Sequence, residues 1–120
     1  MPATVIPLVT LVEFNAAVAN GTALALDASL GGTLTPTKKD GKLLVMLINN
    51  DSGNTTTCTI NKGNGLQGVG PDLEIALEAS QTKLIELETG LFLNVTGDNK
   101  GKIVFEDSAA DTKVIAYELV

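Results

Sequence analysis

The side chains that could do chemistry in this chain are mostly carboxylates, because it has no histidine, arginine or tryptophan and only one cysteine. Two glutamate pairs, Glu74 with Glu78 and Glu86 with Glu88, have the composition of a general acid and base. At strand spacing the members of a pair point outward together. A glycosidase site usually adds aromatic sugar platforms, whereas aromatic residues are only 3% here. We therefore interpret both pairs as a solvated acidic face.

The candidate nucleophiles have no base to activate them. Cys58 would need an imidazole beside it, and the chain has none. Cys58 alternates with Ile60 in an apolar strand pattern, so we predict a buried, inert thiol without an intrachain disulfide. The serines all lie in turn-like sequence, and none has a nucleophile-elbow pattern: Ser29, Ser52, Ser80 and Ser108. The sequence predicts no catalytic residue and no enzyme.

Ligands for a metal ion are equally sparse. Zinc is excluded by the single cysteine and the absent histidine. Calcium needs only oxygen ligands and stays an alternative for two turns, one with Asn49, Asn50, Asp51 and Asn54, the other with Asp98 and Asn99. Because neither turn has the spacing of a calcium loop, we interpret these residues as hydrogen-bonded turn formers and predict no metal site.

A glycine-rich stretch over residues 62–71 has the composition of a phosphate-binding loop. A nucleotide loop needs a following helix and usually a Lys-Ser or Lys-Thr pair, whereas Pro71 and Asp72 follow here. We therefore predict a turn-rich connection and no cofactor.

Length and charge limit the fold and the partners. The 120 residues, 44% of them hydrophobic, suit one domain with one core. A net charge of -6 without any arginine disfavours nucleic acid as a partner. No stretch approaches the ~18 apolar residues that span a bilayer, and no basic residue precedes an apolar stretch at the N-terminus. We expect no membrane segment and no signal peptide.

Short apolar runs between clusters of Gly, Pro, Asn and Asp predict an all-β chain. The expected strands cover residues 8–14, 23–27, 42–48, 55–62, 73–77, 83–88, 91–95, 102–106 and 112–119. Residues 28–41 read as a long connection, with a short strand at 33–35 as an alternative. About eight or nine short strands fit a single-domain antiparallel β-sandwich, jelly-roll or immunoglobulin-like, over residues 1–120. Residues 1–7 would form an extended N-terminal arm.

Two segments have a helical alternative. A capping-box spacing makes a short helix over residues 10–18 compete with the strand at 8–14. Residues 72–88 have helical propensity, but a helix would place Ile75 and Ile85 among charges. We predict two strands there, separated by a turn.

The order of the runs predicts which strands are neighbours. Residues 42–48 and 55–62 flank a strong turn and are expected to form a hairpin. The last three runs are expected to form an antiparallel meander with alternating apolar contacts from Ile103, Phe105, Ile115, Tyr117 and Leu119. Residues 42–48 are apolar on both faces, as in a strand that is covered on both sides or lies at a subunit contact.

The order of features over residues 42–120 resembles that of small β-sandwich decoration proteins, the auxiliary head proteins of tailed bacteriophages. The matching features are the apolar strand 43–48 ending in Asn49-Asn50, the strand 55–62, the glycine-rich stretch 63–69, then 84–92, 100–104 and the terminal strand 112–119. The resemblance implies a non-catalytic virion protein, made in the host cytoplasm, that decorates or stabilises the outer capsid surface. Its partner would be the major capsid protein of a phage head, and a homo-oligomer is left open.

Two other functions stay open at the level of sequence. A β-sandwich interaction or adhesion module, binding protein or glycan, would have the same composition. So would a head-fibre or tail-associated module of a virion. Low charge and few aromatic residues favour binding through repeated surface contact over binding in a pocket.

Overall fold

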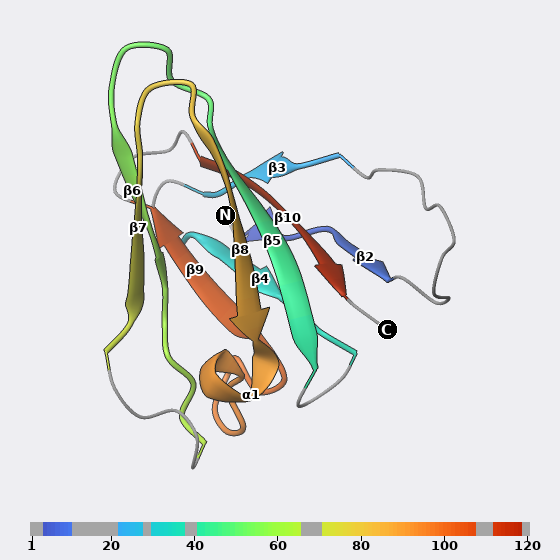
Figure 1. Cartoon of the computed structure of the whole chain (residues 1–120). Helices are drawn as coiled ribbons and strands as arrows, with labels where there is room; N and C mark the ends of the chain where they lie inside the picture. Colours follow the sequence, from blue (N-terminus) through green and yellow to red (C-terminus); the bar gives the residue numbers. More distant parts are fainter. Residues whose placement is uncertain are drawn as a thin grey trace.

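The chain forms two β-sheets packed face to face, as Figure 1 shows for the computed structural model. The structure describes residues 4–10, 22–27, 30–37, 41–65, 71–107 and 112–118. Within these ranges the strands are β1 (Thr4–Val5), β2 (Leu8–Thr10), β3 (Leu24–Ala25), β4 (Gly32–Leu34), β5 (Lys42–Asn49), β6 (Thr56–Ile60), β7 (Leu73–Leu77), β8 (Thr82–Glu88), β9 (Ile103–Asp107) and β10 (Thr112–Glu118). A single helical turn, α1 (Thr89–Phe92), follows β8. The predicted all-β sandwich is confirmed.

Most strands pair with partners that are distant in sequence. Sheet A has the order β1-β4-β9-β6-β7, and sheet B has the order β2-β10-β5-β8, with β3 also pairing with β10. The pairings between these strands are antiparallel apart from two parallel ones, β1 with β4 and β2 with β10. The sheets are therefore mixed where the N-terminal strands join them, rather than purely antiparallel as expected.

The core lies between the sheets and consists of the strand residues that alternate inward. In β5 these are Leu43, Val45 and Leu47, which are fully buried. Sheet A contributes Leu34, Cys58, Ile60, Leu77, Ile103 and Phe105. Burying an aliphatic or aromatic side chain is worth about 1.5–3 kcal/mol, so the period of two in the sequence selects which strand face turns inward.

The first described residues close one side of the sandwich. β1 pairs with β4 in sheet A and β2 pairs with β10 in sheet B, so the chain crosses between the sheets from one strand to the next. Ile6 is buried at this crossing, and its N–H donates to Thr33 O at 2.8 Å. The described part of the expected N-terminal arm is therefore docked against both sheets.

The ambiguous segment at 72–88 forms the two strands β7 and β8, as predicted. Ser80 takes a positive φ of 58° in the turn between them, which a continuous helix would not allow. At the other ambiguous segment, β2 covers Leu8–Thr10. Residues 11–21, and with them most of the alternative helix over 10–18, lie outside the described residues.

The predicted hairpin between residues 42–48 and 55–62 is wrong. β5 lies in sheet B between β10 and β8, whereas β6 lies in sheet A between β9 and β7. Both hydrogen-bonding edges of β5 are thus occupied by strands from later in the chain. The turn after β5 carries the chain across the sandwich instead of back along the same sheet, and the turn from β7 to β8 also changes sheets.

These two crossings lie together at the top of Figure 1, and we call them the double arch (residues 49–55 and 78–81). Asn49 is buried where they meet. Its Nδ2 donates to three backbone carbonyls, those of Asn54 at 2.8 Å, Glu78 at 3.0 Å and Leu77 at 3.2 Å. One amide side chain therefore joins both crossings at this end of the sandwich.

The predicted meander of the last three runs is also wrong. β9 belongs to sheet A and β10 to sheet B, so they do not pair with each other. Residues 91–95 are not a strand, because α1 occupies 89–92 and Leu93 N donates to Thr89 O at 2.9 Å. Thr89 and Leu93 are buried while Leu91 between them is exposed, which a helical turn allows and an alternating strand does not.

The inward face of β10 is the opposite of the predicted one. Val114 points into the core, whereas Ile115 and Tyr117 lie on the outer face. Glu118 is in phase with Val114 and is fully buried. Its carboxylate accepts bonds from the Thr37 N–H at 2.9 Å and from the Thr37 hydroxyl. The prediction followed the apolar residues Ile115 and Tyr117, whereas the strand turns Glu118 inward. The set of inward residues is therefore displaced by one position from the predicted set.

The Cys58 thiol is buried between the sheets, as predicted. Burial, and then the charge of Asp107, raise the pKa of Cys58 to about 12, so the thiol stays protonated at neutral pH. We expect the native protein to react with a chromogenic disulfide reagent at less than about one-hundredth of its rate in denaturant. Native labelling as fast as that of the unfolded chain would contradict the burial of this strand face.

Candidate binding surface

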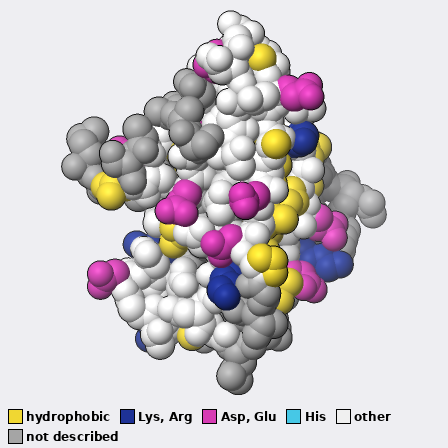
Figure 2. Space-filling view, turned by 90° about the vertical axis from the view of Figure 1, so that its left-hand side faces the viewer, with side chains coloured by type: hydrophobic (Ala, Val, Ile, Leu, Met, Phe, Trp, Pro, Cys, Tyr) yellow, Lys and Arg dark blue, Asp and Glu magenta, His cyan; other side chains and the backbone are white. Residues whose placement is uncertain are grey.

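A group of carboxylates lies on the outer face of sheet A. Thr59 of β6 pairs with Glu74 of β7 on one side and with Glu106 of β9 on the other. Both glutamates are exposed, and they line a shallow depression of ≈ 460 Å³ together with Thr57, Thr59 and Asp107. Figure 2, viewed from the left of Figure 1, shows Asp and Glu side chains gathered in the middle of the molecule.

Asp107 in this depression has a structural role. Its Oδ1 accepts a bond from Thr56 Oγ1 at 2.6 Å, and its Oδ2 accepts one from Thr112 N at 2.9 Å. These bonds tie β9 to β6 and to the start of β10. Among the described residues, no three His, Cys, Asp or Glu side chains are grouped so that they could hold a metal ion. Because Glu74 and Glu106 are exposed, the outer face of sheet A is a solvated acidic surface.

The asparagine and aspartate residues after β5 bond to one another, as predicted for turn formers. Asp51 Oδ1 accepts from Gly53 N at 2.8 Å, and Asp51 Oδ2 accepts from Asn54 Nδ2 at 3.0 Å. Asn49 Oδ1 accepts from Asp51 N at 3.0 Å. The Gly53 N–H, followed by the Asn54 amide, lowers the pKa of Asp51 below its ordinary value. These oxygens stabilise the turn.

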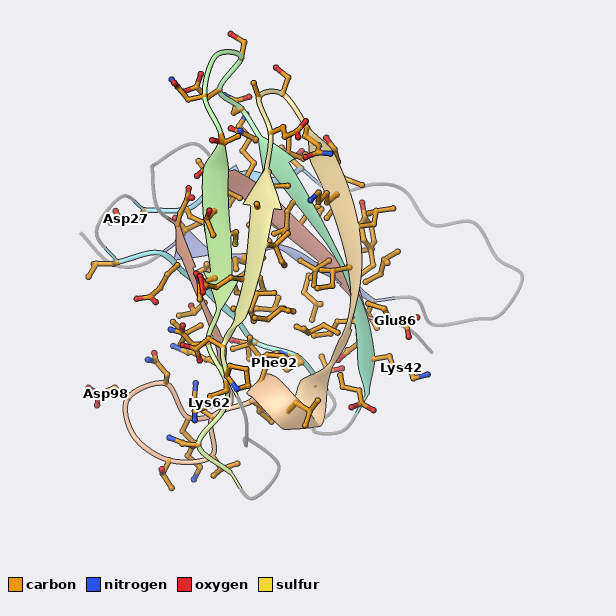
Figure 3. All side chains as sticks on the ribbon, turned by 60° about the vertical axis from the view of Figure 1, so that its left-hand side comes forward. Asp27, Lys42, Lys62, Glu86, Phe92 and Asp98 are labelled. Atoms are coloured by element: carbon orange, nitrogen blue, oxygen red, sulfur yellow. The ribbon has the colours of Figure 1, made fainter. Side chains whose placement is uncertain are left out.

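Among the described residues, the other carboxylates considered for chemistry lie in separate places on the surface. Glu86 and Glu88 are exposed on the outer side of β8, as expected from their spacing, and Glu78 is exposed in the double arch. Asp98 and Asn99 are exposed in a separate turn at the end that carries α1. Figure 3 shows Glu86 and Asp98 at opposite sides of the molecule, both directed away from the core.

The outer face of sheet B carries a row of apolar side chains across three strands. The outward residues of β5, which are Leu44, Met46 and Ile48, are half-buried. The register places Leu84 of β8 on one side of Met46 and Ile115 of β10 on the other. Leu84 is 59% exposed, whereas Ile115 is buried. The two apolar faces predicted for residues 42–48 are therefore the core and this outer surface.

A second row extends the same surface. Tyr117 of β10 pairs with Leu44, and Val9 of β2 pairs with Tyr117. We call the outward residues Leu44, Met46, Ile48, Leu84, Ile115 and Tyr117 the apolar face. Charged residues stand at its margin, with Lys42 paired with Glu88 at one end of the β5–β8 ladder. Figure 3 shows Lys42 and Glu86 projecting from this side of the sandwich.

Comparisons with protein-family models, with curated proteins and with solved structures give no match to this chain. Among the described residues, no helix has both the length and the apolar character needed to cross a membrane.

Proposed function

We propose that this chain is a non-catalytic structural protein that binds the outer surface of a bacteriophage capsid through the apolar face. The observation that carries the proposal is the pair formed on the outer side of sheet B by Leu84, which is 59% exposed, and the half-buried Met46. An antiparallel sheet with its inner face in the core usually presents a polar outer face. The exposed Leu84 beside the half-buried Leu44, Met46 and Ile48 instead favours contact with another protein surface. The resemblance over residues 42–120 favours a capsid as that surface.

The distribution of charge supports one orientation on the capsid. Exposed Glu74 and Glu106 lie on the outer face of sheet A, where they keep that side hydrated. The apolar face has an apolar centre with charges at its margin, which is the usual arrangement of a protein interface. Sheet B would therefore face the capsid and sheet A the solvent.

The symmetry of a capsid makes a modest contact sufficient. A closed shell presents the same surface many times, so each copy of this chain would find an equivalent site. Two or more linked copies would bind with a high effective concentration, and their combined affinity would exceed that of one copy.

Sedimentation with emptied capsids of the phage that encodes the chain tests this proposal. Because the contact is mainly apolar, we expect the bound fraction to change by less than about twofold between roughly 0.05 and 0.5 M salt. Met46→Lys should weaken binding at least about tenfold, since it places a charge in the middle of the apolar row.

Thr59→Lys is the matched control. It introduces the same side chain on the outer face of sheet A, where Glu74 and Glu106 flank the position. This variant should bind capsids like the parent chain. Absence of co-sedimentation at any salt, or complete loss at moderate salt, would contradict the proposal. Specific glycan binding without capsid binding would favour an adhesion module.

A further inference from the structure

The strand β8 lies at one end of sheet B and has an open edge. The sheet order ends at β8, and no described strand lies on its far side. At seven residues, β8 is as long as β10 and nearly as long as β5, both of which have strands on either side. A long, regular edge strand is a template for pairing with another chain.

The ladder between β5 and β8 determines which backbone groups point to the open edge. Asn49 N donates to Gln81 O at 2.9 Å at one end, and Thr89 N donates to Gly41 O at 3.0 Å at the other. Bonded pairs alternate in an antiparallel ladder, so the odd-numbered residues of β8 bond to β5. The N–H and C=O groups that point outward therefore belong to Thr82, Leu84, Glu86 and Glu88.

The neighbouring edge of sheet A is protected, which leaves β8 as the more open of the two. β7 and β8 face each other across the core in Figure 3, and Lys83 Nζ donates to Ala76 O at 2.7 Å between them. A lysine over an edge carbonyl blocks the approach of another strand. Ile75 and Ile85 are only half-buried along this side of the sandwich, so a partner here would also cover apolar surface.

We propose that two copies of this chain form a dimer in which β8 pairs antiparallel with β8 of the second copy, centred on Ile85. In this register Leu84 lies opposite Glu86 of the second copy, and Thr82 lies opposite its Glu88. Every N–H and C=O group that points to the open edge of β8 then faces such a group on β8 of the second copy. No like charges stand opposite each other, and the contact is identical on both copies, as a two-fold dimer requires.

The two nearest registers are less favourable. Centring the pair on Glu86 would place the two copies of that carboxylate directly opposite each other. Centring it on Leu84 would place Glu88 opposite Ser80, which lies in the turn before the strand with a φ of 58°. The Ile85 register therefore uses the whole strand.

The dimer would join the two copies of sheet B into one continuous sheet and place both apolar faces on the same side. This inference goes beyond capsid binding and does not rest on it, because it concerns the edge of sheet B rather than its outer face. A dimer that fails to bind capsids, or a monomer that binds them, would separate the two proposals.

Sedimentation velocity of the purified chain is the first test. We expect the molecular mass to rise with concentration from 12.4 kDa to twice that value. A chain that stays monomeric up to about 1 mM, or one that forms a trimer, would overturn the inference.

Leu84→Glu and Leu84→Lys test the register at one exposed position. Leu84→Glu places a second carboxylate opposite Glu86 of the other copy, and the two-fold axis repeats this repulsion. Leu84→Lys places an ammonium there instead. We expect the dimer of Leu84→Glu to be at least about tenfold weaker than that of Leu84→Lys.

Circular dichroism on both variants confirms that each keeps the β-sheet signal of the parent chain. Equal dimer affinity of the two folded variants would overturn the pairing through β8.

Discussion

Replacing Gly31 with alanine is expected to lower the free energy of unfolding by at least about 4 kcal/mol, a large share of the roughly 5–15 kcal/mol of a typical domain. Gly31 has a φ of +68°, and a Cβ added there would lie 2.0 Å from Phe105 O. The atom it meets is backbone of β9, beside a fully buried ring, so the neighbour cannot rotate away. Urea unfolding monitored by circular dichroism measures the loss.

Gly101→Ala separates the two causes of the loss at Gly31, which are the left-handed backbone and the steric clash of the added Cβ. Gly101 has a similar φ of +79°, but a Cβ there would meet nothing within 4 Å. This variant should lose only about 1–2 kcal/mol, the cost of a left-handed backbone with a side chain. The difference between the two variants is then the cost of the close approach of Gly31 to β9. Equal losses of stability in the two variants would contradict the close contact between Gly31 and the backbone of β9.

Asn49→Ala is expected to destabilise the protein by about 3–4 kcal/mol. The amide of Asn49 donates to the carbonyls of Asn54, Glu78 and Leu77, and its oxygen accepts from Asp51 N. Alanine would remove all four bonds at a position that is only 1% exposed, and of the three carbonyls Glu78 O would keep the Gln81 N–H as a donor. Buried polar groups without partners cost about 1–3 kcal/mol each, with partial relief from entering water. Thermal and urea unfolding measure the effect.

Asn54→Ala is the control in the same turn. It removes the bond from Asn54 Nδ2 to Asp51 in an exposed position and keeps the Asn54 carbonyl that Asn49 uses. We expect a loss of about 0.5 kcal/mol or less. If both variants lost the same stability, the double arch would not depend on the Asn49 amide.

Local patterns in the sequence identified the strands better than they identified which strands pair with each other. Alternation at Cys58 and Ile60, and again across residues 73–88, indicated the inward faces of β6, β7 and β8 correctly. The turn after β5 was recognised from its asparagines, but a turn signal specifies a change of direction and not the sheet that the next strand joins. That choice depends on β8 and β10 occupying both edges of β5, which are contacts between distant residues.

The apolar face was only partly visible in the sequence. The run at residues 42–48 is apolar at every second position on both sides, and this predicted a second covered face for β5. The sequence did not show that Leu84 and Tyr117 belong to the same surface. They lie on β8 and β10, and the pairing of these strands with β5 joins residues that are distant in sequence. For β10, the inward Glu118 reversed the assignment of Tyr117 and Ile115, since a buried carboxylate depends on the distant Thr37.

The strand β2 cannot complete its pairing until β10 has been synthesised, because Ala116 follows its partner Leu8 by more than one hundred residues. β10 also lies at the centre of sheet B, between β2 and β5. A nascent chain on the ribosome therefore lacks the middle of one sheet until β10 emerges. We expect the slow folding typical of all-β proteins with distant pairings. Chains released before β10 would keep the apolar β5 unpaired on that edge and would be prone to aggregation.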